Sequence, residues 1–281
     1  MSIETGVAAS ELTVIEPRQH WFAIDLKALW QYRELLFFLV WRDVKVRYKQ
    51  TVLGLGWAIL QPLLTMVVFS AVFGGFAKIP SDGVPYPIFA YVALLPWNYF
   101  AGAFSRSGQS LVNSANLITK VYFPRLIVPI SAALAGLVDF AVAFVLLLGM
   151  MLFYGIRPTA ALWTLPLFIL LALVTALAVG LWLSALNVKY RDVGHVIPFL
   201  AQLWLYASPV AYPTSLVPER WRLFYSLNPM AGVIDGFRWA LLGTAALDWR
   251  VLAISTVIVL LILFSGLAYF NRTEDIFADV I

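Results

Sequence analysis

Six long stretches of apolar residues divide the chain, and each is long enough to cross a membrane. They cover residues 57–77, 84–105, 126–154, 162–186, 195–213 and 251–270. A spanning helix needs about 20 mainly apolar residues. It also satisfies its backbone hydrogen bonds within one segment, which lipid requires, whereas a barrel would need short alternating strands. The pattern therefore predicts an all-α integral membrane protein with six transmembrane helices.

The segment before the first stretch, residues 29–50, has a different pattern. Leu29, Leu36, Val40, Val44 and Tyr48 recur at helical spacing. Its second half also carries the basic residues Arg42, Lys45, Arg47 and Lys49. A helix of this kind lies in the headgroup layer, where each Lys or Arg attracts anionic groups by about 1 kcal/mol. We predict an N-terminal interfacial amphipathic helix, while noting that the same charges orient the chain whether or not they bind a ligand.

Two shorter helices are expected between the last two stretches, over residues 218–227 and 229–242. Asn228 suits the N-cap of the second helix, Pro229 its first turn and Gly243 its end. Neither helix is long enough to span a bilayer. They predict a re-entrant or interfacial hairpin on the outer face, with a small surface subdomain as the alternative. The expected organisation is a cytoplasmic segment 1–28, the interfacial helix 29–50 and a transmembrane domain 51–281.

Composition and charge agree with a membrane protein. Hydrophobic residues make up 62% of the chain and charged residues 12%, which is too apolar a balance for a soluble domain. The net charge of +4 comes from basic residues in the short connections, so membrane topology explains it better than nucleic-acid binding does. With the amino terminus inside, the cytoplasmic segments hold 13 of the 19 Lys and Arg residues. The first 28 residues lack the pattern of a cleaved signal peptide. Both termini are therefore expected in the cytoplasm.

The sequence lacks the residues for several kinds of chemistry. It has no cysteine, no phosphate-loop motif and only two histidines, in unrelated segments. Disulfides, thiolate metal sites and nucleotide binding by this chain are therefore not expected, and neither is any other metal site. Its acidic residues form no compact catalytic set. The chain is expected to be a transport protein and not an enzyme.

Asp139 falls near the middle of the third stretch. An isolated charge there costs about 2.5–3.5 kcal/mol on insertion scales, so its carboxylate should face protein or water. It could line a pathway, relay a proton or bond a neighbouring helix, and no Lys or Arg partner is visible within the stretches.

Aromatic residues beside prolines and amides form a further pattern within the spans. Rings with a polar handle can stack on sugars and bond hydroxyl groups, although Trp and Tyr also form ordinary belts at membrane interfaces. The candidates for lining a glycan channel are Trp97, Tyr99, Phe100, Trp204, Tyr206 and Tyr212.

Residues 41–62, which read WRDVKVRYKQTVLGLGWAILQP, closely resemble the signature of ABC-2 type polysaccharide export permeases, the Wzm and TagG-like family. YFPR at 122–125, NVKYRD at 187–192 and the pair Asn228-Pro229 resemble further parts of it. The resemblance covers about residue 30 to the end of the chain.

This resemblance implies a half-transporter in the inner membrane of a bacterium. Two copies would form the pore, and two copies of a separate ATPase subunit, which binds ATP and Mg, would drive it. The cargo would be a polysaccharide linked to a polyprenyl pyrophosphate, with O-antigen favoured over capsule, teichoic acid or a small lipid or drug. The pyrophosphate would meet Arg42, Lys45, Arg47, Tyr48 and Lys49. A coupling helix near residues 110–122 would contact the ATPase through Asn113, Ser114, Asn116 and Lys120.

Two readings of a different class stay open at this point. A membrane-embedded polyprenyl-sugar transferase would share the basic helix and the long spans, but it would need a set of acidic residues. A stand-alone channel would transport without any ATPase.

Overall fold

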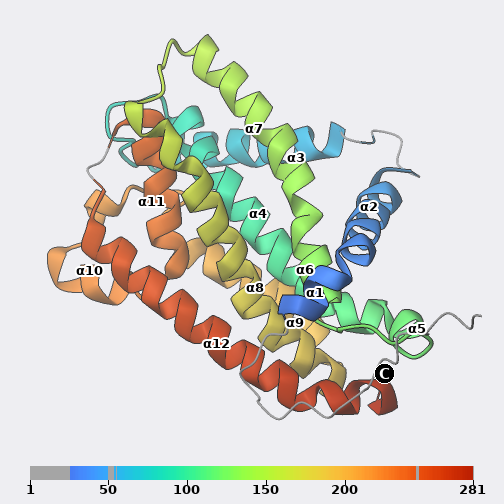
Figure 1. The fold of residues 1–281 in the computed structure, drawn as a ribbon. Helices are drawn as coiled ribbons and strands as arrows, with labels where there is room; N and C mark the ends of the chain where they lie inside the picture. Colours follow the sequence, from blue (N-terminus) through green and yellow to red (C-terminus); the bar gives the residue numbers. More distant parts are fainter. Residues whose placement is uncertain (1–25, 50–53, 55, 245–246, 281) are drawn as a thin grey trace, which may run out of the picture.

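The computed structural model describes residues 26–49, 54, 56–244 and 247–280 (Figure 1). Every regular element in these ranges is helical. The elements are α1 (Leu26–Gln31), α2 (Arg33–Lys49), α3 (Gly56–Phe69), the π-helix η1 (Ser70–Phe76), α4 (Tyr86–Asn113), α5 (Ala115–Ile118), α6 (Ile127–Leu134), α7 (Gly136–Phe153), η2 (Ala160–Thr164), α8 (Leu165–Lys189), α9 (Val193–Ala207), η3 (Thr214–Leu216), α10 (Glu219–Tyr225), α11 (Pro229–Leu242) and α12 (Trp249–Val280). The all-helical prediction is confirmed for this part of the chain. The predicted segment 1–28 lies, up to residue 25, outside it.

Within the described ranges, five helical segments are long and apolar enough to cross a membrane. They are Gly56–Phe76, Tyr86–Asn113, Ile127–Phe153, Ala160–Lys189 and Trp249–Asp275. The remaining stretch, 195–213, forms α9, which has 15 residues and ends at Ala207. Such a helix is about 22 Å long, against a hydrocarbon core of about 30 Å. A sixth span is therefore not confirmed by helix length.

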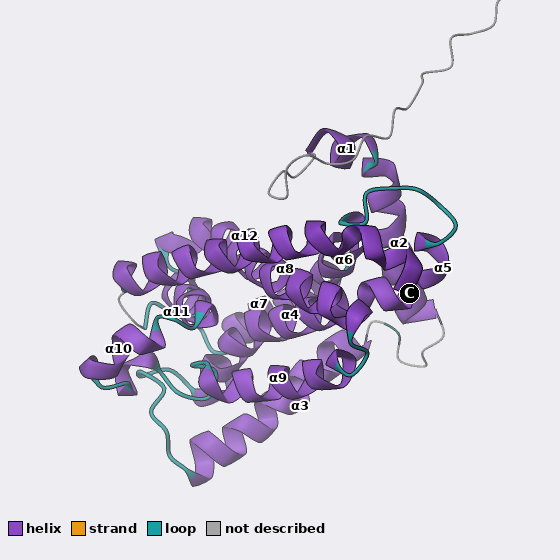
Figure 2. Cartoon of the chain, turned by 90° about the horizontal axis from the view of Figure 1, so that it is seen from below, coloured by secondary structure: helices purple, strands orange, loops and turns teal. Residues whose placement is uncertain are grey.

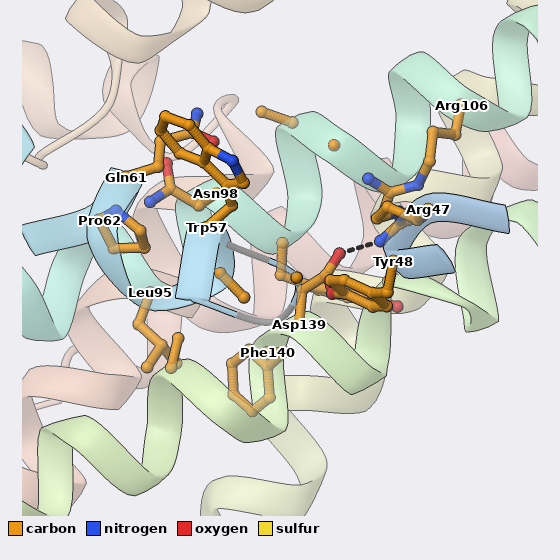
Figure 3. Close-up of a pocket in the computed structure, with 17 residues that line it drawn as sticks. Arg47, Tyr48, Trp57, Gln61, Pro62, Leu95, Asn98, Arg106, Asp139 and Phe140 are labelled. Carbon is orange, nitrogen blue, oxygen red and sulfur yellow. Dashed lines mark hydrogen bonds and ion pairs between the residues drawn. The ribbon is translucent and has the colours of Figure 1, made fainter. Parts of the chain in front are cut away.

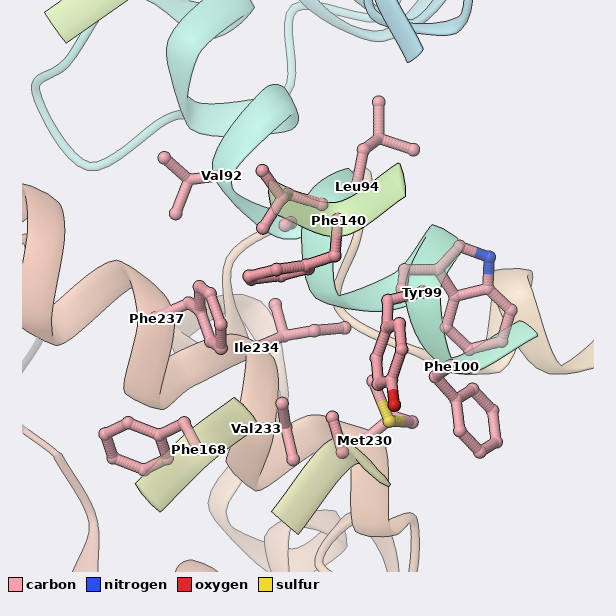
Figure 4. Close-up of a cluster of buried hydrophobic side chains, with 14 of the residues drawn as sticks. Val92, Leu94, Tyr99, Phe100, Phe140, Phe168, Met230, Val233, Ile234 and Phe237 are labelled. Carbon is pink, nitrogen blue, oxygen red and sulfur yellow. The ribbon is translucent and has the colours of Figure 1, made fainter. Parts of the chain in front are cut away.

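The helix α4 is the centre of the bundle. It is the least apolar of the five candidate spans, yet 78% of its apolar window is buried inside the chain, against 11% for Gly56–Phe76. Its less apolar faces therefore meet protein, as expected for polar groups in a membrane bundle. Figure 4 shows the packed cluster that α4 forms with side chains such as Phe140, Phe168 and Phe237.

Glycines let α4 and α8 approach each other closely. A Cβ added at Gly180 on α8 would come within 2.6 Å of the Ser107 Cβ on α4. One added at Gly108 on α4 would come within 3.0 Å of the Leu183 Cβ. Small residues at such contacts are typical of helix packing in membranes, where close contact replaces the hydrophobic effect.

Gly180→Ala should therefore destabilise the chain by about 1–3 kcal/mol, because the added methyl group forces α8 away from Ser107. Gly149→Ala is the matched control, since the space at Gly149 on α7 is open and alanine is the better helix former by up to about 1 kcal/mol. Thermal unfolding in detergent should show a lower midpoint for the first variant and an equal or higher one for the second. Equal midpoints would contradict this packing.

The bundle has two distinct ends, which we name the α10 end and the α5 end (Figure 2). α10 and α11 lie at the first, and α2, α5 and the C-terminal part of α12 at the second (Figures 1 and 2). A separate apolar cluster forms at the α5 end and includes Leu39, Ile118 and Phe277.

The predicted N-terminal helix and the predicted hairpin differ in how well the structure matches them. The expected single helix over 29–50 is divided into α1 and α2, and α2 packs beside α6. The expected hairpin helices are present as α10 and α11. The Asn228 side chain accepts a hydrogen bond from the Met230 amide at 3.1 Å, and Gly243 ends α11 at a φ of +65°. An interfacial position for α2 and a re-entrant position for the hairpin both stay predictions.

Candidate functional site

A cavity of about 400 Å³ opens where α2, α3, α4 and α7 meet (Figure 3). Apolar groups such as Pro62, Leu95 and Phe140 form part of its wall. The polar side chains that line it are Arg47, Tyr48, Gln61, Asn98, Tyr99, Arg106 and Asp139. A mainly apolar hollow with a few convergent polar groups is the usual form of a ligand site.

Asp139 of α7 is the hydrogen-bond acceptor for two of the polar side chains that line the cavity. It accepts hydrogen bonds from Arg47 and Tyr48, which are adjacent residues of α2 (Figure 3). Only 26% of the Arg47 side chain and 29% of the Asp139 side chain are exposed. Sequence inspection found no partner for this acid because its partner comes from a helix 92 residues earlier. The pair neutralises a charge that would otherwise lie alone within a span.

The predicted basic cluster is only partly gathered at the cavity. Arg47 and Tyr48 enter it, whereas Arg42 pairs with the adjacent Asp43 at 2.8 Å. Lys45 and Lys49 are exposed. Arg42 does line a neighbouring hollow of about 470 Å³ between α2 and the end of α4, which also contains Arg47, Arg106, Asn113 and Ser114. A role of these five residues in pyrophosphate binding stays a prediction.

A second polar centre lies at the α10 end, where the chain leaves α9. Arg238 of α11 donates to the carbonyl of Val210 at 3.0 Å and to that of Tyr212 at 3.2 Å. The Tyr86 hydroxyl donates to the carbonyl between them, Ala211, at 2.6 Å. Side chains thus satisfy three consecutive carbonyls that no helix satisfies, as backbone groups shielded from water require.

Asp235 lies beside Arg238 on α11 and accepts a hydrogen bond from Thr214 at 2.8 Å. Burial raises the pKa of Asp235, although the nearby positive charge of Arg238 and the bond from Thr214 oppose the shift. Burial likewise lowers the pKa of Arg238 to about 10, and Asp235 opposes that shift. Each charged group therefore stabilises the charged form of the other in a poorly hydrated place.

Comparison with known proteins identifies the family. The model of the ABC-2 type transporter family matches residues 34–242, which is most of the chain. This chain belongs to the ABC-2 type transporter family. The resemblance drawn from residues 41–62 is thereby confirmed, and the chain is a multi-pass permease.

This ABC-2 permease is similar to polysaccharide exporters along nearly its whole length. It is 30% identical to the O-antigen export system permease protein RfbA of Myxococcus xanthus, over 91% of this chain and 98% of the relative. An RfbA of Klebsiella pneumoniae is 27% identical, over 88% and 95%. The polysialic acid transport protein KpsM of Escherichia coli is 21% identical, over 83% and 91%.

The predicted coupling segment of the permease lies at the α5 end. Asn113 is the last residue of α4, Ser114 follows it, and Asn116 belongs to the short helix α5. Asn113, Asn116 and Lys120 are exposed, whereas Ser114 is buried. The structure thus presents three of the four side chains to a partner, and contact with an ATPase stays a prediction.

The predicted channel aromatics of the permease do not lie on one surface. Trp97, Tyr99 and Phe100 are buried within the chain, and the Phe100 ring lies 5.0 Å from the Trp204 ring. Trp204 also donates to Asn228 at 2.8 Å. Tyr206 is 60% exposed, and Tyr212 is half-buried against Tyr225. Burial favours packing roles for Trp97 and Phe100, while a channel role for any ring stays a prediction.

Sequence reasoning did not single out Arg106, which lines the cavity, or Arg238, which lies at the second polar centre. Both were counted only as charges of the connecting segments. A signal for Arg106 was present, since Gly102 lies one helical turn earlier and leaves room for its guanidinium. A signal for Arg238 was Asp235, three residues earlier on the same expected helix.

Proposed function

We propose that this ABC-2 permease is the membrane subunit of an ATP-driven exporter of a polysaccharide linked to a polyprenyl pyrophosphate. O-antigen is the proposed cargo. The observation that carries the proposal is the similarity to O-antigen export permeases, over 91% of the chain for the Myxococcus xanthus protein and 88% for the Klebsiella pneumoniae protein. Two copies would form the pore in the inner membrane, and two ATPase subunits with ATP and Mg would drive it.

The course of the chain supports six crossings with both termini in the cytoplasm. α8 ends near Val188, which belongs to the apolar cluster at the α5 end. α12 begins near Trp249, whose ring lies 6.1 Å from Trp239 of α11 at the α10 end. The chain therefore has to travel between the two ends through α9 and the residues after it. A short sixth crossing is proposed there, completed by the non-helical residues that Arg238 and Tyr86 bind.

The cavity supports an anionic lipid-linked cargo. α2 carries Arg47 and Tyr48 to a site between the spans, and Lys45 and Lys49 are exposed on the same helix. Exposed lysines would attract the diphosphate to α2, and the cavity would receive it. Movement of α5 by the ATPase would then reach α4 directly, because Ser114 joins the two helices.

Similarity to the polysialic acid transport protein favours capsule export as the second candidate. Deletion of the gene followed by complementation separates the candidates. We expect the deletion strain to lose surface O-antigen and to retain the lipid-linked glycan inside, and the wild-type chain to restore export. Normal surface O-antigen in the deletion strain would refute the assignment, and loss of capsule alone would favour the second candidate.

Lys45→Gln/Lys49→Gln should weaken the affinity of α2 for anionic lipid by about 2 kcal/mol, or about 30-fold. Export should fall while the unfolding midpoint stays unchanged, because both side chains are exposed. Lys78→Gln, at an exposed position between η1 and α4, is the matched control and should leave export unchanged. Export rates in complemented cells provide the measurement. Equal export by all three chains would refute a role for these lysines.

A further inference from the structure

We propose that Arg106 and Tyr99, together with Arg47, form a phosphate-binding site inside the cavity. In the proposed site, Asp139 forms an ion pair with Arg47 until a phosphate group displaces its carboxylate. The ligand class is a diphosphate carried by a lipid. The assignment of the lipid rests on the proposed function, whereas the phosphate site rests on the geometry alone.

Arg106 is a guanidinium held in a prepared space. It extends from α4, and its Nε donates to the carbonyl of Ala132 at 3.3 Å. Its terminal nitrogens lie where a Cβ on Gly102 or Gly136 would be, so any larger residue on either helix would collide with them. The glycines on these two helices thus leave a space at the same point, and the planar guanidinium of Arg106 fills it.

No carboxylate in the described ranges forms an ion pair with Arg106, in contrast to Arg42 and Arg47. A guanidinium in a largely enclosed place normally has an anion to bind. Its two terminal nitrogens have the fork geometry that matches phosphate oxygens. Asp43 acts on Arg106 electrostatically but forms its ion pair with Arg42, so the lack of a paired carboxylate at Arg106 in this part of the chain indicates an anionic ligand.

Tyr99 provides a second, independent indication. Its side chain is 4% exposed, and its hydroxyl has no hydrogen-bond partner among the described residues. It lines the same cavity, and a Cβ at Gly136 would lie 3.4 Å from its Cε2 as well as against the Arg106 guanidinium. Buried hydroxyl groups are nearly always bonded, so this donor is available to a ligand that also reaches Arg106.

The Asp139 carboxylate makes the contacts that a phosphate group would make in this site. Its two oxygens accept from Arg47 and Tyr48 as two oxygens of a phosphate would. Arg47 and Arg106 also line both the 400 Å³ cavity and the 470 Å³ hollow beside it, so they stand between the two spaces. The other acid nearby, Asp43, already pairs with Arg42. A diphosphate that enters the cavity would therefore displace the Asp139 carboxylate from Arg47 and would bind the guanidinium groups of both Arg47 and Arg106.

The test is direct binding to the purified chain together with its partner subunits. Calorimetric titration with farnesyl pyrophosphate, inorganic pyrophosphate and farnesol separates the lipid diphosphate from the free anion and from the lipid alone. We expect farnesyl pyrophosphate to bind best. Arg106→Gln should weaken its binding at least tenfold and Tyr99→Phe several-fold, whereas Asp139→Asn should strengthen it.

Controls distinguish loss of the site from loss of the fold or of charge. Arg106→Lys retains the charge without the fork and should bind with intermediate affinity, and Arg157→Gln, at an exposed position after α7, should bind normally. Wild-type affinity in folded Arg106→Gln overturns the site, and unchanged affinity in Asp139→Asn overturns the displacement. Equal binding of inorganic pyrophosphate assigns the site to a free anion and overturns the lipid. Since no export is measured, failure here is distinct from failure of the proposed function.

Discussion

Arg238→Met is expected to destabilise the chain by about 3–5 kcal/mol, which is the usual cost of breaking a buried charged network. Arg238 is 2% exposed, and its guanidinium lies 3.7 Å from the centre of the Phe89 ring. Its loss leaves the carbonyls of Val210 and Tyr212 unbonded and removes the positive charge beside Asp235. Methionine fills much of the volume, so the change mainly removes polar contacts.

The measurement is unfolding in mixed detergent micelles, with Arg220→Met as the matched control. Arg220 is an exposed residue of α10 at the same end of the bundle, and its replacement should change stability by less than about 0.5 kcal/mol. The same small change in both variants would show that the carbonyls after α9 do not depend on Arg238.

The second large effect concerns the ion pair between Arg47 and Asp139. Arg47→Gln and Asp139→Asn should each cost about 2–3 kcal/mol, somewhat less than for a fully buried pair, because both side chains are about one quarter exposed. Each single change leaves one charge between the spans without its partner. The double variant removes both charges, so it should be more stable than the sum of the single costs predicts.

A double-mutant cycle measures this coupling in the same unfolding assay. We expect a coupling energy of about 1–3 kcal/mol, together with at least tenfold lower export for Arg47→Gln. Additive effects would mean that the two charges act independently and would remove Asp139 from the site. Stability regained in the double variant without regained export would assign Arg47 a function beyond neutralising Asp139.

The helices themselves were largely predictable from the sequence. Run length located the five helical segments that are long enough to span, and Asn228 and Gly243 located the ends of α11, because each of these signals is local. α4 continues to Asn113, beyond the expected end at residue 105, because Gly102 and Gly136 accommodate Arg106 within the bundle. The sequence prediction ended the span before the charged residue Arg106. It could not show that Gly136, at the start of α7, leaves room for this side chain.

The contacts that define the site could not be predicted, because they join distant segments. Asp139 meets Arg47 across 92 residues, and Arg238 meets Val210 across 28. The last apolar stretch before the hairpin ends its helix at Ala207, where side chains of α4 and α11 replace the backbone partners. Hydropathy reports the length of a run, but it carries no information about such long-range capping.

The measurement that tests the central claim most directly is transport in reconstituted vesicles. The chain and its ATPase partner would be placed in vesicles with a labelled polyprenyl-pyrophosphate-linked O-antigen glycan, and glycan crossing would be detected with a membrane-impermeant glycosidase. The account predicts crossing that requires ATP, the ATPase subunit and the diphosphate. Crossing that continues without ATP or without the ATPase, or no crossing by an active complex, would contradict it.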